Sequence, residues 1–177
     1  ITYVATDEGW LYLAAVKDMA TREIVGWSMA DHLRSSLCEN ALMMAIQHRA
    51  PPRGLIHHSD RGVQYTSIRY TERLAEACVA RSVGSVGDSY DNALAETING
   101  LYKTEVIKRR GPWRSVDSVE YATLLWVDWF NNRRLLEPIG YVPPAEYEAR
   151  YSERLHTTPI DEGVAAGILQ PAPLDDH

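Results

Sequence analysis

Two acidic residues, Asp60 and Glu96, stand at positions in the sequence that are typical of ligands in a divalent-metal site. Asp60 follows the short apolar run 54–58, and ligands of open α/β sheets bind at the carboxyl ends of such strands. Glu96 lies near the start of a long predicted helix. Mg²⁺ prefers oxygen ligands and is usually bound by a few carboxylates together with substrate phosphate oxygens. The pair therefore indicates phosphoryl transfer, and a third acid is expected because two carboxylates would hold two ions poorly.

The predicted helix that carries Glu96 is amphipathic. At ~100° per residue, Leu94, Ile98 and Leu101 fall on one stripe. The opposite side carries Asn92, Glu96, Asn99 and Lys103. Gly100 costs roughly 1 kcal/mol against alanine inside a helix, which suggests that something approaches closely there. Two plainer interpretations stay open: Glu96 on a solvated helix face, and Asp60 as a turn residue.

Other candidates for a metal or nucleophilic site are weaker. Asp7 lies in a predicted turn and should be solvated, while Asp18 ends a predicted strand and can accept backbone hydrogen bonds. The adjacent His57 and His58 lack a second His or Cys pair at zinc-ligand spacing. Ser59 lacks the glycine-flanked elbow of a serine nucleophile.

Basic residues follow Glu96 and are interspersed with tryptophans. The cations are Lys103, Lys108, Arg109, Arg110, Arg114, Arg133 and Arg134, and the tryptophans are Trp113, Trp126 and Trp129. One interpretation is a strip that contacts phosphates next to the metal site. The alternative is a solvated helix end with tryptophans in the core.

The elements that must position these residues form an α/β fold. Hydrophobic patterning and turn residues predict an antiparallel meander of three strands in residues 1–30, followed by mixed elements and then helices. The helices are predicted at 36–48, with a Ser36–Glu39 capping box, and at 66–78, 91–109, 115–131 and 144–151; short strands are predicted at 54–58 and 79–85. These elements indicate one mixed sheet with helices packed against it, within a core of residues 1–150. Residues 151–177 are predicted to be a weakly ordered acidic tail.

Composition excludes several classes of protein, and the distribution of charged residues along the chain changes what the net charge implies. The 177 residues contain no apolar run of the roughly 20 residues needed to cross a bilayer, and two distant cysteines exclude a disulfide scaffold. The net charge of -6 taken alone disfavours a nucleic-acid partner. However, residues 1–134 carry 16 basic and 16 acidic side chains, and residues 135–177 carry 2 and 8. Residues 97–134, beside Glu96, carry 7 basic and 4 acidic side chains, so DNA remains a plausible partner for this region.

Several ordered motifs resemble the integrase-type catalytic core of bacterial insertion-sequence transposases of the OrfB type. The chain opens with segments 1–4, 8–13 and 22–27 that are similar to the start of that core. Segment 57–65 (HHSDRGVQY) resembles the family's second-aspartate motif, and segment 89–96 (SYDNALAE) resembles its glutamate motif, with 35 residues between Asp60 and Glu96. Segments 130–134 (FNNRR) and 143–147 (PPAEY) resemble its C-terminal signature.

This resemblance implies an RNase H-like fold and a D-D-E site that cuts and joins DNA strands by in-line attack on phosphodiesters. Asp60 and Glu96 would be the catalytic metal ligands for two Mg²⁺ or Mn²⁺ ions. The DNA-contacting residues would include Lys103, seven positions after Glu96, with Asn92, Asn99, Lys108, Arg109 and Arg110 beside it. The partners would be transposon ends and target DNA, bound by a homo-oligomer in the bacterial cytoplasm at the nucleoid, with no membrane association.

The family's first catalytic Asp stands immediately before the Ile-Thr-Tyr that begins this sequence. We therefore expect the chain by itself to be an N-terminally truncated core that is impaired or inactive in catalysis. Two alternatives stay open on these residues: an RNase H-like nuclease that cuts without joining, and a catalytically dead DNA-binding or assembly remnant.

Overall fold

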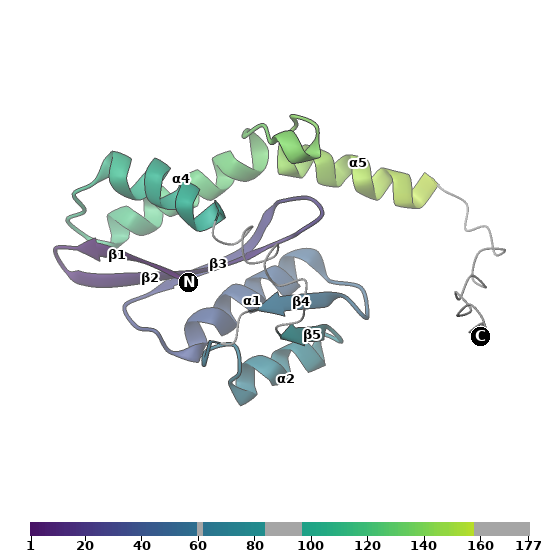
Figure 1. Ribbon diagram of the computed structural model, residues 1–177, viewed down its shortest axis with the longest axis horizontal. Coiled ribbons are helices and arrows are strands. Elements are labelled where there is room, and N and C mark those ends of the chain that lie inside the picture. The colour runs from purple at the N-terminus through teal and green to yellow at the C-terminus, as the bar shows by residue number, and fades with distance from the viewer. Residues whose placement is uncertain (60–61, 84–96, 158–177) are drawn as a thin grey trace, which may run out of the picture.

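The computed structural model describes residues 1–59, 62–83 and 97–157 (Figure 1). In chain order the strands are β1 (Thr2–Thr6), β2 (Gly9–Lys17), β3 (Ile24–Ala30), β4 (Ile56–Ser59) and β5 (Ala80–Val83). The helices are α1 (Ser35–Arg49), α2 (Ile68–Glu76), α4 (Val116–Asn132) and α5 (Pro144–Thr157), with a 3-10 turn η2 (Glu137–Ile139). Residues 97–110 are also helical, and their middle, η1 (Lys103–Lys108), is a π-helix. We call this segment helix 97–110.

The predicted three-stranded meander is confirmed. Strands β1, β2 and β3 form an antiparallel sheet in that order, with Val4 opposite Leu11 and Leu13 opposite Met29. Directly opposed residues share a face, because side chains alternate along each strand. Figure 1 shows α4 on one side of this sheet and α1 on the other.

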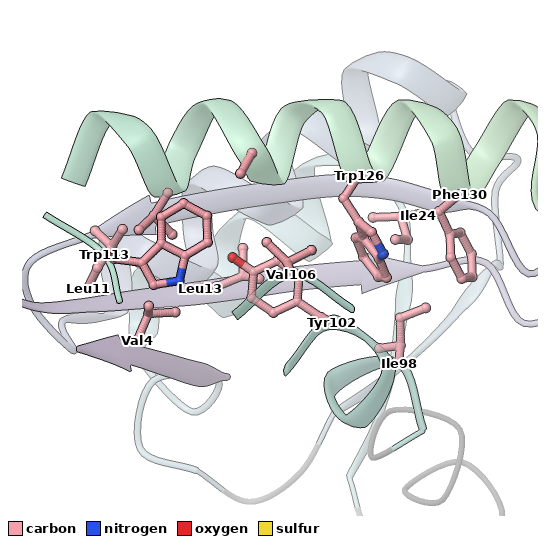
Figure 2. Close-up of a cluster of buried hydrophobic side chains, with 12 residues drawn as sticks. Val4, Leu11, Leu13, Ile24, Ile98, Tyr102, Val106, Trp113, Trp126 and Phe130 are labelled. Carbon is pink, nitrogen blue, oxygen red and sulfur yellow. The ribbon is translucent and has the colours of Figure 1, made fainter. Parts of the chain in front are cut away.

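The sheet face that carries Val4, Leu11 and Leu13 forms the larger hydrophobic core (Figure 2). Ile24 of β3 also belongs to this cluster. Helix 97–110 and α4 supply the other side chains: Ile98, Tyr102, Val106, Val119, Ala122, Trp126 and Phe130, with Trp113 between the two helices. Trp113 and Trp126 are therefore core residues, as the plainer interpretation of the tryptophans predicted. The opposite face packs against α1 and α2 through a second cluster around Leu37, Leu42, Tyr70 and Leu74.

Strands β4 and β5 pair in parallel and form a separate two-stranded sheet. The sequence indicated one mixed sheet, whereas the described strands divide the antiparallel and the parallel pairing between two sheets. Ile56 of β4 is 56% exposed, so β4 is less buried than its apolar sequence predicted. The apolar composition of a short strand does not by itself determine how many neighbouring strands and helices cover it.

The helix ends differ from prediction in two places. α1 begins after Arg34, which makes no side-chain cap hydrogen bond, so the predicted Ser36–Glu39 capping box is wrong. α5 continues to Thr157 instead of ending near residue 151, and it therefore extends beyond the predicted core boundary at residue 150. An ion pair of 2.5 Å between Arg49 and Glu148 joins α5 to α1. The tail predicted for 151–177 lies outside the described residues from 158 onward. No helix in the described ranges combines the length and apolarity that a membrane crossing needs.

Candidate active site and DNA-facing surface

The predicted metal ligands adjoin two elements that the structure describes. Asp60 immediately follows β4, which ends at Ser59, and Glu96 immediately precedes helix 97–110. Asp60, Glu96 and Asn92 themselves lie outside the described residues. The site can therefore be assessed through the contacts that position its two neighbouring elements.

Side chains on both sides of Asp60 contact α2 or the loop before α1. His57 Nε2 lies 2.8 Å from the hydroxyl of Tyr70, on α2. The ring of Tyr65 packs edge-on against the same Tyr70, with 5.5 Å between the ring centroids. Gln64 donates a hydrogen bond of 3.3 Å to the carbonyl of Leu33. Three residues of the HHSDRGVQY motif, His57, Gln64 and Tyr65, thus make structural contacts, and the catalytic role of Asp60 stays a prediction.

His57 is neutral in the fold. Burial, together with the nearby charges of His58 and Arg81, lowers its pKa from 6.5 to about 4. A neutral ring whose Nε2 is already within hydrogen-bond distance of Tyr70 suits a positioning role. This contact occupies the Nε2 of His57 and disfavours a zinc site at His57 and His58.

This pKa predicts a dependence of stability on pH. Between pH 6.5 and about 4 the unfolded chain protonates His57 and the folded chain does not, so the free energy of unfolding falls as pH is lowered through this window. We expect urea unfolding at pH 6.5 and at about pH 5 to show a larger loss for wild type than for His57→Gln, whose amide can still bond Tyr70. Equal losses would contradict a neutral buried His57.

Helix 97–110 is fixed against α4 on its apolar side. Ile98, Tyr102 and Val106 are buried in the larger core (Figure 2). The Tyr102 hydroxyl lies 2.6 Å from Oγ1 of Thr123 on α4. Burial raises the pKa of Tyr102 to about 12, against the opposing effect of the Thr123 hydrogen bond, so the phenol stays protonated. The segment that directly follows Glu96 therefore has a well-packed support.

Glu105, in the π-helical turn, contacts Trp126 in α4 and Arg134 just beyond the C-terminal end of α4. Its carboxylate accepts a hydrogen bond of 2.8 Å from the indole of Trp126 and forms an ion pair of 2.6 Å with Arg134. The guanidinium of Arg134 also lies over the rings of Trp129 and Phe130, at 5.3 and 5.5 Å from their centroids. Arg134 was included in the predicted phosphate-contacting strip, but its ion pair and ring contacts give it a structural role.

Asn131, also in the FNNRR motif, joins α4 to the sheet. Its side-chain amide donates to the carbonyl of Ile24 and accepts from the Ile24 N–H, each at 2.9 Å. Because Asn131 is buried, truncation would leave both backbone groups of Ile24 without these partners. The C-terminal signature therefore stabilises the contact between α4 and β3.

We expect Asn131→Ala to lower the free energy of unfolding by about 1–3 kcal/mol, the usual cost of buried polar groups that lose their partners. Chemical denaturation would measure the effect. The matched control is Asn132→Ala, because Asn132 is exposed and its amide bonds only within α4, to Asp128. A similar loss in both variants would contradict the role given to Asn131.

The predicted DNA-contacting residues of helix 97–110 have different environments. Lys108, Arg109 and Arg110 are exposed. Lys103 is half-buried, with its Nζ 5.3 Å from the centroid of the Tyr3 ring. Asn99 is half-buried and lines a cavity of about 10 Å³ next to Trp27 and Trp126. Contact of any of these residues with DNA stays a prediction.

The alternative acids behave as predicted. Asp7 is exposed in the β1–β2 turn. Asp18 accepts hydrogen bonds from the N–H groups of Ala20 and Thr21, at 2.8 and 2.9 Å. Within the ranges that the structure covers, no three His, Cys, Asp or Glu side chains gather where they could hold a metal ion.

Comparison with known protein families shows which family the chain belongs to. A family described as "Integrase core domain" matches residues 1–89, and a second family of the same description matches residues 77–144. The chain belongs to the integrase core domain family. This integrase core is 55% identical over 156 residues to a protein of insertion sequence element IS986/IS6110 from Mycobacterium tuberculosis, covering 85% of this chain and 56% of the relative. It is 51% identical over 150 residues to the transposase for insertion sequence element IS629 from Shigella sonnei, covering 85% and 50%. The integrase core thus spans about half the length of these relatives.

Solved structures confirm the RNase H-like fold of this integrase core. It matches the catalytic core domain of BIV integrase with a TM-score of 0.66 at 15% identity, covering 88% of this chain and 95% of that one. It also matches the HTLV-2 integrase catalytic core domain in complex with magnesium, with a TM-score of 0.64 at 16% identity, covering 82% and 90%. At such identities the likeness extends to the fold alone.

Sequence reasoning missed two groups of residues around the integrase core's site. Tyr70, on α2, contacts both His57 and Tyr65, and these residues are up to 13 positions apart. No local sequence pattern predicts such a pairing. The exposed pair Tyr3 and Trp10 did have a signal, because aromatic residues in a hairpin should pair across the strands.

Proposed function

We propose that this chain is the catalytic core of a transposase that cuts and joins DNA strands with the help of divalent metal ions. The carrying observation is that Asp60 directly follows β4 and Glu96 directly precedes the well-packed helix 97–110, within a region matched by the integrase core family. The 51% identity to the IS629 transposase supports the same conclusion. We further propose that transposon ends and target DNA are the substrates and that the enzyme acts as a homo-oligomer in the bacterial cytoplasm.

The chemistry of the proposed ligands suits Mg²⁺ or Mn²⁺. Asp60 and Glu96 offer hard oxygen donors, whereas His57, three residues before Asp60, has its Nε2 next to the hydroxyl of Tyr70. When bound, two such ions would supply activation of the attacking oxygen and charge stabilisation of the leaving oxygen. The HTLV-2 integrase core, which has the same fold, is described in complex with magnesium.

Basic residues of helix 97–110 would orient the DNA. Lys103 is half-buried, so its ammonium is restricted in position and can bind a phosphate without losing much side-chain freedom. Lys108, Arg109 and Arg110 are exposed and give the end of the same helix a positive charge that attracts the DNA backbone. Asn92 and Asn99 are the remaining candidates for positioning the substrate.

The test is an assay of cleavage and joining on labelled transposon ends with added Mg²⁺ or Mn²⁺. Joined products that require the metal would support a transposase. Cleaved but unjoined products would support the RNase H-like nuclease instead. Binding of DNA without cleavage, in a protein that carries all three acids of the family, would favour a DNA-binding or assembly remnant.

A further inference from the structure

Two large aromatic side chains lie together on the surface of the β1–β2 hairpin. Tyr3 is 56% exposed and Trp10 is 54% exposed. Their rings meet edge to face, with 5.3 Å between the centroids and an interplanar angle of 79°. The rings therefore support each other while each keeps about half of its surface open to a ligand.

The hairpin register explains why this pair is exposed. Tyr3 lies opposite Tyr12, and Trp10 lies opposite Ala5, so these side chains share one face of the sheet. Tyr12 packs against the smaller core beneath α1 and α2, whereas Tyr3 and Trp10 lie outside that cluster. β1 is also an edge strand, with β2 as its partner in the described sheet.

A cation from another element completes this surface. Lys103, on helix 97–110, places its Nζ 5.3 Å from the centroid of the Tyr3 ring. The acidic side chains of the hairpin turn are Asp7, which is exposed, and Glu8, which accepts a hydrogen bond of 2.8 Å from the N–H of Val116, at the start of α4. This surface therefore has a positive charge beside the Tyr3 ring.

We propose that Tyr3 and Trp10 form a stacking platform for unpaired nucleobases of DNA, with Lys103 bound to an adjacent phosphate. Proteins bind single strands by combining aromatic rings that stack on bases with cations that follow the backbone. In a duplex the bases are already stacked on one another, so the platform selects unpaired or frayed bases. The proposal rests on the proposed function, because it assigns the platform to the DNA that this core would cut or join.

The position of Lys103 also sets a direction. A phosphate is favoured at Lys103, so a bound strand should place its backbone on the Tyr3 side and its base over the rings. A neutral peptide would gain from the apolar rings but not from the lysine, whereas an acidic peptide would gain from both. Binding of an acidic peptide in place of DNA is therefore an outcome against the proposal.

The experiment measures binding of the 177-residue chain to fluorescent oligonucleotides by anisotropy. The probes are a short single strand and a blunt duplex of the same sequence. We expect Tyr3→Ala and Trp10→Ala each to weaken binding of the single strand about 5- to 100-fold, the usual range for one stacked base. Binding of the duplex should change less than about twofold in both variants.

Two matched controls separate stacking from loss of surface. Tyr3→Phe keeps the ring and should bind the single strand like wild type. Tyr121→Ala removes a 64% exposed tyrosine from α4, away from the platform, and should also bind like wild type.

Lys103→Ala should reduce the slope of log K against log salt for the single strand by about 0.7, the value for one phosphate contact. Circular dichroism of each variant verifies that the fold is intact.

The outcomes distinguish this proposal from the proposed function. Unchanged single-strand binding in Tyr3→Ala and Trp10→Ala overturns the platform, even if the metal-dependent joining reaction is observed. Equal weakening for the single strand and the duplex overturns the preference for unpaired bases. The platform is supported if single-strand binding weakens in Tyr3→Ala and Trp10→Ala while Tyr3→Phe and Tyr121→Ala bind like wild type. This result counts for the platform whether or not joined products are found.

Discussion

Asp60→Asn should lower DNA cleavage and joining on the order of 10³-fold or more in a transposase that carries this core. The substitution keeps the size of the side chain but removes the negative charge that would bind the metal ion at the proposed site. The fold should be retained, because the contacts of His57 and Tyr65 with Tyr70 hold β4 and the segment around Tyr65 to α2. Gel assays of labelled transposon ends would measure the loss.

Glu96→Gln should have a loss of similar size for the same reason. The helix that follows is supported by its own contacts with the core and with α4, through Tyr102, Val106 and Glu105. Binding of DNA, measured by anisotropy, should persist in both variants because it depends on basic residues. Metal affinity, measured by calorimetry, should fall in both.

The matched control is Asp7→Asn, which removes an exposed carboxylate in a turn. It should leave cleavage and joining unchanged. Full activity of Asp60→Asn or of Glu96→Gln would show that the metal ligands have been assigned wrongly. A parallel loss of DNA binding or of thermal stability would instead indicate that the acid has a structural role.

The elements of the fold that were predictable have local signals. Runs of β-branched, aromatic and apolar residues separated by turn residues predicted β1, β2 and β3, and the structure confirms these strands. The starts of α2 and α4 coincide with Ser67 and Ser115, whose side chains accept hydrogen bonds from the N–H groups of Tyr70 and Ser118. Such caps act within three residues and can be read directly from sequence.

The contacts that position the site were not predictable, because they join residues that are distant in sequence. Glu105 and Arg134 are 29 residues apart, and Asn131 and Ile24 are 107 apart. A basic motif such as FNNRR looks the same in sequence whether its arginine contacts a phosphate or a half-buried carboxylate. The capping box at Ser36 failed for a related reason: its residues fit the pattern, but the chain enters α1 one residue earlier and without a side-chain cap.

The metal site itself rests on motif resemblance and on family membership. The spacing of Asp60 and Glu96 has meaning only if β4 and helix 97–110 bring both acids to one place. The structure describes the supports of each acid separately, and the two catalytic substitutions above are the direct test of whether they act together.

Gly26→Ala should be the most destabilising single-methyl substitution in the sheet, at about 3 kcal/mol or more. Gly26 lies on β3, on the face that packs against α1. A Cβ there would lie 2.2 Å from the carbonyl oxygen of Ala41 and 2.7 Å from the nitrogen of Ala45. Both atoms belong to the backbone of α1, so the helix as a whole would have to move away from the sheet.

That displacement would also disturb the site through the shared core. α1 contributes Leu37, Cys38 and Leu42 to the cluster that contains Tyr70, and Tyr70 is the partner of His57. We therefore expect Gly26→Ala to reduce catalysis as well as stability, and to do so more at 37 °C than at low temperature. Thermal and urea unfolding, with activity measured at both temperatures, would verify this.

Gly100→Ala is the matched control, and it should have the opposite sign. Apart from its chain neighbours and the adjacent backbone of its own helix, no atom of the described residues lies within 4 Å of the position that its Cβ would occupy, and Gly100 is exposed in helix 97–110. Alanine should therefore stabilise the free protein by about 0.5–1 kcal/mol, because glycine loses more backbone entropy in a helix. If Gly100→Ala raises stability but weakens DNA binding, the close approach expected from its sequence position is made by DNA. If Gly26→Ala and Gly100→Ala change stability alike, tight packing of α1 on β3 is not what requires glycine at position 26.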